Sequence, residues 1–248
     1  MVIQAIRYTL PDSDETFDGV IKTTLIDMLI TMLGDTSLEN RRLALTTLNS
    51  AAHNKPELIN PNLGQLLPLI MKESVIKPEL IREVMMGPFK HKVDDGLEVR
   101  KSAYETLYSL METAFSRINI LDFYDRIIAG LQDEHDIRAL CNLMLTKLVV
   151  LDHEETSRRL DAIADCFRAI LSTKLKDNAV KQELEKQDEA VKSTLRVTLL
   201  LNKAIPTAST GGTQGSQHQN WRTYWEWVDK DFAPLLRTIA DESKEPGI

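Results

Sequence analysis

Apolar residues recur along most of the chain at the three-to-four-residue spacing that is typical of amphipathic helices. One such pattern runs over residues 20–33 and ends before Gly34, a residue that favours helix C-termini. Residues 35–37, Asp-Thr-Ser, supply N-cap chemistry for a second helix over 38–53. A third apolar helix is expected over 63–71.

The helical pattern also repeats within the chain. LENRRLALTTL, from Leu38, aligns with LEVRKSAYETL, from Leu97, at an offset of 97 − 38 = 59. A weaker copy places Arg138 on Arg100, at an offset of 138 − 100 = 38, and a still weaker one places Lys192 on Arg138, at 192 − 138 = 54. Repeats of the HEAT and armadillo kind are about 40–47 residues long. The fold predicted from this spacing is an all-α, HEAT/armadillo-type α-solenoid over residues 1–205.

The alignment makes predictions about particular positions. In three of the four copies the basic residue follows an apolar one, whereas Arg41 follows Asn40, and acidic residues lie just upstream in all four. An aspartate is therefore expected to cap the second helix of each pair. Small or apolar residues three positions after the basic residue are expected to be buried where two helices meet. The equivalent basic positions are Arg41, Arg100 and Arg138, and the equivalent buried positions are Ala44, Ala103 and Cys141.

One stretch breaks this rhythm. The offset of 59 exceeds the offset of 38 by 21, and the stretch over 76–94 is almost as long as this excess. Gly87-Pro88 lies inside the stretch and no helix should continue through it. The local pattern over 78–84, with an early proline and glutamate, by itself favours a short helix.

The C-terminal part has a different composition. Residues 206–220 are rich in Ser, Thr, Gly and Gln and are expected to form a flexible linker. A helical segment is expected over 221–241, with Asn220 as its N-cap and an interruption at Pro234. Its aromatic stripe fits either a helix that caps the last repeat or a helix that binds a partner. The stripe consists of Trp221, Tyr224, Trp225, Val228 and Phe232.

Composition narrows the function. The net charge of −7 disfavours direct binding of nucleic acid, which needs a cationic surface. No apolar run reaches the roughly 20 residues of a membrane span, and no signal peptide is visible, so we expect a cytoplasmic and nuclear protein. The five histidines and two cysteines lack metal-site spacing, and no phosphate loop or nucleophile motif is present. We therefore expect a non-enzymatic protein without a cofactor or metal.

Three segments carry a family resemblance: NSAAHNKP over 49–56, ELIREVMMGPFKHKVDDGLEVRK over 79–101 and NAVKQELEKQDE over 178–189. They resemble the C-terminal HEAT repeats of the cullin-associated, neddylation-dissociated family, which is also described as TATA-binding-protein-interacting. The likeness covers about residues 2–201, and the chain departs from the family pattern after Pro206. The expectation is a piece of a longer repeat array that carries its C-terminal end.

The resemblance implies a local structure and a function that the repeat spacing does not indicate. It implies a β-hairpin over about 77–93, with its turn at Gly87-Pro88, that occupies the adaptor-binding site on the N-terminal domain of a cullin. It further implies an assembly or exchange factor for cullin–RING (SCF-type) ubiquitin ligases. The alternatives are a protein that binds a TATA-binding protein and a transport-type HEAT scaffold. The expected contact residues are Met85, Met86, Gly87, Pro88, Phe89, Lys90 and His91.

Overall fold

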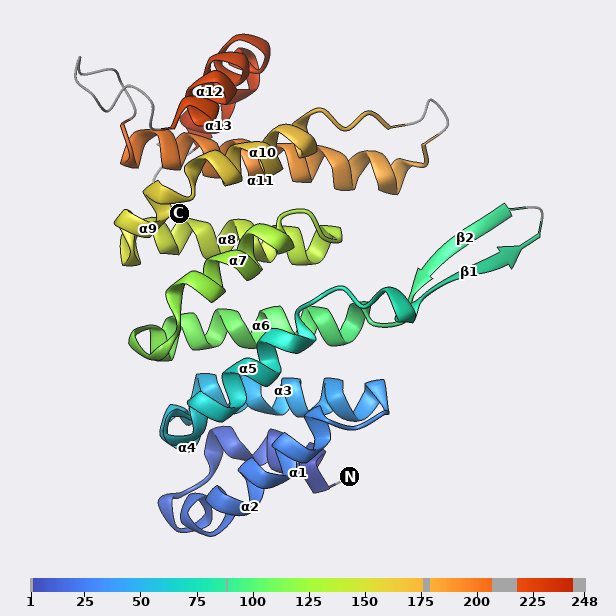
Figure 1. Ribbon diagram of the computed structural model, residues 1–248, viewed down its shortest axis with the longest axis vertical. Coiled ribbons are helices and arrows are strands. Elements are labelled where there is room, and N and C mark those ends of the chain that lie inside the picture. Colours follow the sequence, from blue (N-terminus) through green and yellow to red (C-terminus); the bar gives the residue numbers. More distant parts are fainter. Residues whose placement is uncertain (1, 88, 176–178, 207–217, 243–248) are drawn as a thin grey trace. The chain divides into compact units, whose positions relative to one another are not determined.

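The computed structural model describes residues 2–87, 89–175, 179–206 and 218–242. The fold is all-α and of the α-solenoid class, built from helix pairs, with one antiparallel β-hairpin (Figure 1). The chain divides into two compact units, residues 1–120 and 121–248. The sequence analysis treated 1–205 as one solenoid, because the repeat pattern continues through position 120 without a break.

The first unit stacks its helices around α3 and α6, which lie side by side, with α1 and α2 against α3 and α5 against α6. The hairpin of β1 and β2 lies between α5 and α6 in the sequence. The elements are α1 Val2–Thr9, α2 Glu15–Leu33, α3 Leu38–Asn54, α4 Pro56–Ile59, α5 Leu63–Glu73, β1 Ile81–Met86, β2 Phe89–Asp94 and α6 Leu97–Ala114.

The contact between α3 and α6 confirms the buried positions that the repeat alignment predicts. Ala44 and Ala103 are fully buried, and small side chains there let the two helices approach closely. One turn after Ala103, the Thr106 hydroxyl donates to the backbone oxygen of Leu45 at 3.0 Å, which is a direct bond between the two helices.

Three helix starts follow the predicted offsets. The helices α3, α6 and α8 (His135–Leu151) begin at positions 38, 97 and 135, which reproduces the offsets 97 − 38 = 59 and 135 − 97 = 38. The fourth copy is less regular. The same alignment would start it at 135 + 54 = 189, whereas α11 (Lys181–Ala204) begins about two turns earlier, because its first two turns are a solvent-exposed charged extension.

The predicted capping by aspartate needs a correction. The N-cap residues of α3, α6 and α8 are Ser37, Gly96 and Glu134, and the aspartate stands one or two residues before each. Its carboxylate accepts the N–H of the cap residue itself, which orders the turn before the helix. The pairs are Asp35 with Ser37 at 2.8 Å, Asp94 with Gly96 at 2.9 Å and Asp133 with Glu134 at 2.7 Å. Asp188 of the fourth copy lies inside α11 and forms an ion pair with Lys192.

The helix α2 differs from the sequence prediction in two respects. The helix α2 begins at Glu15, ahead of the predicted start at Val20, because the Asp14 side chain caps it by accepting the N–H of Phe17. Val20 was predicted on the apolar face but is 75% exposed, whereas Leu25 and Leu29 are buried. Gly34 is the C-cap residue of α2, as predicted.

The second unit contains a pair that the sequence analysis kept apart from the repeats. Within it α8 lies beside α11 and α10 beside α11, while α12 packs on α10 and α13 on α11. The segment after the linker therefore adds another helix pair to the stack. The remaining elements are α7 Ile120–Gly130, α9 His153–Arg158, α10 Leu160–Leu171, α12 Gln219–Asp231 and α13 Ala233–Glu242.

The aromatic stripe of α12 is the inner face of this last pair. Trp221 and Tyr224 are fully buried, and the Tyr224 hydroxyl lies 2.7 Å from the Thr198 hydroxyl of α11. Asn220 is not the N-cap: it lies inside α12, its side chain donates to Asp165, and His218 is the cap residue. Most of the predicted linker, residues 207–217, lies outside the described residues.

Candidate protein-binding site

The hairpin replaces a short turn of the repeat. The helices α2 and α3 are joined by the four residues 34–37, and α7 and α8 by the four residues 131–134. The corresponding connection between α5 and α6 runs from Ser74 to Gly96 and is several times longer. The insertion therefore lies at a position where the helix pair needs only a turn, and Figure 1 shows β1 and β2 extending outward from the ends of α5 and α6.

The turn of the hairpin explains its register. The strands pair from Ile81 with Asp94 to Met86 with Phe89, which leaves two residues between them. Gly87 has φ of +63°, a backbone conformation that side-chain-bearing residues rarely adopt and that tight hairpins require. The glycine that interrupts the helical pattern thus fixes the place where the chain reverses.

The local helix prediction over 78–84 is wrong beyond its first residues. Only Pro78–Leu80 is helical, as a single 3-10 turn, and the strand β1 begins at Ile81. The proline and glutamate at 78 and 79 do start a helical turn. The following residues instead pair with β2, because the cross-strand ladder satisfies backbone groups that a short helix would leave unpaired.

The register places the described side chains on two faces. Glu83 with Lys92 and Met85 with Lys90 share one face, because directly paired residues of an antiparallel ladder point the same way. The Lys90 ammonium lies 3.4 Å from the Glu83 carboxylate on that face. The other face carries the pairs Arg82 with Val93 and Val84 with His91. One face of the hairpin therefore carries Met85 with charged side chains, and the opposite face carries Val84 and Val93 with Arg82 and His91.

The structure places the predicted contact residues at the end of the hairpin, as far as it describes them. Met85 is 61% exposed, and Gly87, Lys90 and His91 are exposed. The backbones of Met86 and Phe89 form the last pair of the ladder. Their side chains, and all of Pro88, lie outside the described residues.

The base of the hairpin holds charged residues whose pairing the sequence did not predict. The Arg82 guanidinium donates to both carboxylate oxygens of Asp95, at 2.6 and 3.1 Å. This hydrogen bonding lowers the pKa of the Asp95 carboxyl below its ordinary value. Asp94, the last residue of β2, forms an ion pair at 2.9 Å with the buried Arg100. The signal available in the sequence was the repeat alignment, which singled out Arg100 but not its partner.

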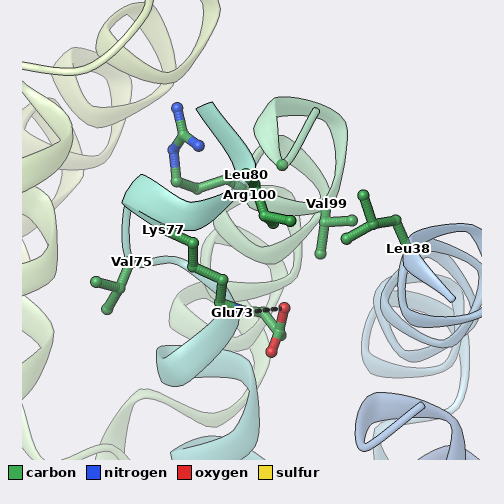
Figure 2. Close-up of a pocket in the computed structure, with 8 residues that line it drawn as sticks. Leu38, Glu73, Val75, Lys77, Leu80, Val99 and Arg100 are labelled. Carbon is green, nitrogen blue, oxygen red and sulfur yellow. Dashed lines mark hydrogen bonds and ion pairs between the residues drawn. The ribbon is translucent and has the colours of Figure 1, made fainter. Parts of the chain in front are cut away.

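A small pocket lies where the hairpin joins the helices. Its cavity volume is about 10 Å³, and it is lined by residues of α3, α5 and α6 together with Val75, Lys77 and Leu80. Figure 2 shows Leu38 and Val99 extending toward each other and Lys77 joined to Glu73. Small-molecule sites usually measure roughly 300–1,000 Å³. The exposed hairpin, and not this pocket, is therefore the candidate binding site.

Other chemistry offers no competing site in the part of the chain that the structure describes. Among those residues no group of three or more His, Cys, Asp or Glu side chains could hold a metal ion. Burial raises the pKa of both free thiols, Cys141 and Cys166, which keeps them protonated. No helix within the described ranges is long and apolar enough to cross a membrane.

The fold and the site define a class: an α-solenoid protein of helix-pair repeats that projects one exposed hairpin from a turn between two helices. Comparison with known proteins identifies the family within that class. The family model described as "TATA-binding protein interacting (TIP20)" matches residues 58–229, and this chain belongs to that family.

Relatives from distant organisms carry a different name. The chain is 52% identical to "Cullin-associated NEDD8-dissociated protein 1, C-terminal part" of Emericella nidulans, over 98% of this chain and 23% of that protein. It is 42% identical to "Cullin-associated NEDD8-dissociated protein 1" of Drosophila melanogaster, over 84% of this chain and 17% of that protein. It is 39% identical to "Cullin-associated NEDD8-dissociated protein 2" of Rattus norvegicus, over 94% of this chain and 18% of that protein. The chain thus spans about a fifth of each relative's length.

Proposed function

We propose that this chain is a non-enzymatic, cullin-binding segment of an assembly or exchange factor for cullin–RING (SCF-type) ubiquitin ligases. The hairpin of β1 and β2 binds the N-terminal domain of a cullin at the site of the substrate adaptor. Because the two sites overlap, each bound partner raises the apparent dissociation of the other. The protein acts in the cytoplasm and the nucleus.

The observation that carries the proposal is the exposed hairpin itself. Met85 leaves 61% of its surface in water on an element that leads away from the helices, where it adds nothing to the core. Methionine and aromatic residues are favoured at the centres of protein interfaces, and β2 places Phe89, Lys90 and His91 consecutively in one strand. The names of the relatives, which describe cullin-associated proteins, support a cullin as the partner.

The test is competition with an adaptor on a cullin N-terminal domain. A Met86→Ala/Phe89→Ala double variant is compared with the parent chain, because a segment of a longer protein can bind weakly even unmutated. Loss of an interface anchor costs about 2 kcal/mol or more, which corresponds to roughly thirtyfold weaker binding. We expect the melting temperature to stay at the parent value, because the insertion lies outside the helix pairs.

A matched control separates the hairpin from general surface hydrophobicity. Val150, on α8, is 82% exposed and lies outside the hairpin, so Val150→Ala should leave the competition unchanged. Full adaptor competition by the double variant would place the contact elsewhere. A collapse in its melting temperature would instead make Phe89 a structural residue.

The family description supplies the alternative partner. A TATA-binding protein is assayed in parallel with the cullin domain, together with a nuclear-transport GTPase as the partner of a transport-type scaffold. Binding to either of these proteins without binding to the cullin would replace the proposed function.

A further inference from the structure

We propose that Arg41 and Arg100 are positioning residues that clamp the two ends of the hairpin segment and fix the direction in which the hairpin points. The clamp itself follows from contacts within the first unit. Its effect on partner binding rests on the proposed function of the hairpin. The two arginines occupy equivalent positions of successive repeats, at the offset 100 − 41 = 59, so the repeat supplies both halves of the clamp.

The downstream end is held from α6. Arg100 is only 2% exposed, and its guanidinium lies 2.9 Å from the carboxylate of Asp94, the last residue of β2. The other carboxylate oxygen of Asp94 accepts the N–H of Gly96 at 2.9 Å. A buried charge that loses its partner is strongly unfavourable. The end of β2 is therefore held against the first turn of α6.

The upstream end is held from α3 through α5. The Arg41 guanidinium donates to the Glu73 carboxylate at 3.1 Å, and the Lys77 ammonium lies 2.5 Å from the same oxygen. Glu73, the last residue of α5, is 4% exposed. Lys77 directly precedes the 3-10 turn that leads into β1, and its backbone oxygen accepts the N–H of Leu80 at 3.0 Å. Figure 2 shows the contact between Lys77 and Glu73.

Two contacts tie the upstream and downstream ends to each other. The N–H of Asp95 donates to the backbone oxygen of Leu80 at 3.0 Å, and the Arg82 side chain binds the Asp95 carboxylate. The Leu80 side chain also packs against the start of α6, because a Cβ at Gly96 would lie 2.9 Å from the Leu80 Cδ1 atom. The hairpin thus starts from a closed base, which the half-buried Arg41 links to α3 through Glu73 and the buried Arg100 links to α6.

In the second unit, the repeat position equivalent to Arg41 and Arg100 lies after a short turn without a hairpin, and its arginine has a different partner. Arg138, the third member of the set, belongs to the second unit and donates to the backbone oxygen of Asp133 at 2.9 Å. There the arginine closes a four-residue turn. This difference makes Arg138 a matched control for a general effect of losing a repeat arginine.

A clamped hairpin lowers the entropic cost of binding, because its direction is set before the partner arrives. A hairpin attached by free ends would instead lose that freedom on binding. The clamp predicts a narrow distribution of hairpin directions in the free chain and a broad one when either attachment is removed.

The experiment measures that distribution directly in the full chain. Spin labels are attached to two introduced cysteines, Met85→Cys on the hairpin and Glu105→Cys on α6, which are both exposed positions. Pulsed electron–electron double resonance then gives the distribution of distances between the two labels. The native cysteines Cys141 and Cys166 are buried, and a chain without the two introduced cysteines controls for their labelling. The parent and Arg138→Met should give one narrow peak.

The clamp variants should broaden that peak. Arg100→Met removes the ion pair with Asp94, and Arg41→Met removes the link from α3 to Glu73. In case either variant fails to fold, Asp94→Asn weakens the downstream ion pair from the hairpin side, and Lys77→Met removes the contact of the upstream end with Glu73. Distributions that stay as narrow as the parent's in the folded variants overturn the clamp. Equal broadening of the distance distribution in Arg138→Met also overturns the clamp, because the effect would then not depend on contacts with the hairpin segment.

Cullin binding is measured on the same arginine variants without the introduced cysteines, because Met85 is itself an expected contact residue. We expect affinity to fall by about tenfold as preorganisation is lost. The two proposals fail separately. A parent chain that does not bind a cullin overturns the proposed function, while the distance distributions still decide the clamp. Broadened distance distributions with unchanged cullin affinity would overturn the contribution of the clamp to binding.

Discussion

The close contact between α3 and α6 makes Ala103→Leu a sharp test of the repeat alignment. Ala103 is fully buried, and one turn further on the Thr106 hydroxyl reaches the Leu45 backbone oxygen at 3.0 Å. A leucine would place three additional carbon atoms where the two helices already touch. The helices would have to separate, or the new side chain would have to adopt a strained rotamer, so we expect destabilisation.

The magnitude follows from the packing. Overfilling a well-packed core costs about 1–3 kcal/mol. For a unit that spans residues 1–120, about 1 kcal/mol corresponds to about 4 °C in melting temperature, so the variant should melt about 4–12 °C below the parent.

The assay is thermal unfolding followed by far-ultraviolet circular dichroism. Glu98→Leu introduces the same side chain at an exposed position of α6 and should leave the melting temperature within about 1 °C, as surface substitutions usually do. Cys141→Leu tests the equivalent position of the second unit, which is also fully buried, and should destabilise that unit. An Ala103→Leu protein that melts with the parent would refute the tight contact and, with it, the alignment that predicted it.

Two further predictions concern single contacts, and a third concerns the hairpin as a whole. Tyr224→Phe removes a buried hydroxyl that pairs with Thr198, and should lower the free energy of unfolding by about 1 kcal/mol in a urea titration. The Asp95 carboxyl has a folded-state pKa below 3.8 because Arg82 donates to it, so its contribution to stability is complete above pH 3.8 and is lost as the pH falls through the lowered pKa. A carboxyl-carbon NMR titration should give a midpoint below 3.8 that returns toward 3.8 in Arg82→Gln; the same midpoint in both proteins would contradict the pairing. Replacing residues 82–93 with a two-residue Asn-Gly turn keeps Lys77 and Asp94 with their partners, and should preserve the helical circular dichroism signal while abolishing adaptor competition. An unfolded product would show that the hairpin is part of the core.

Much of the helical scaffold is predictable because it depends on burial that recurs along the chain. The starts of α3 and α6 follow from one alignment, since the same apolar positions must face the same neighbours in each repeat. Val20 shows the limit of this reasoning: an apolar residue in the correct phase is exposed when no element covers that part of the helix. The early start of α11 at Lys181 shows a second limit, since charged residues extend a helix without leaving an apolar period.

The hairpin could not be derived from periodicity. A strand that packs on a core alternates apolar and polar residues, but this hairpin packs one strand only against the other and extends away from the helices. Its side chains therefore need not alternate between apolar and polar residues. Pro78 and Glu79 gave a helical signal that extends no further than one turn. What the sequence did show was the excess length of the repeat and the glycine at the turn, and the family resemblance supplied the strand pairing.

The base of the hairpin shows how a repeat fold can carry a directed contact. An insertion in a turn costs the helix stack little stability, because the helices on either side keep their own partners. A long insertion would, however, ordinarily move freely. Here the repeat already places an arginine in the first turns of α3 and of α6, where each must be paired because it is largely or fully buried. Arg41 reaches the start of the insertion through Glu73, and Arg100 reaches its end at Asp94. The direction of the hairpin is therefore set by ion pairs that neutralise the arginines of the repeat. Only the side chains at the exposed end of the hairpin then depend on the partner.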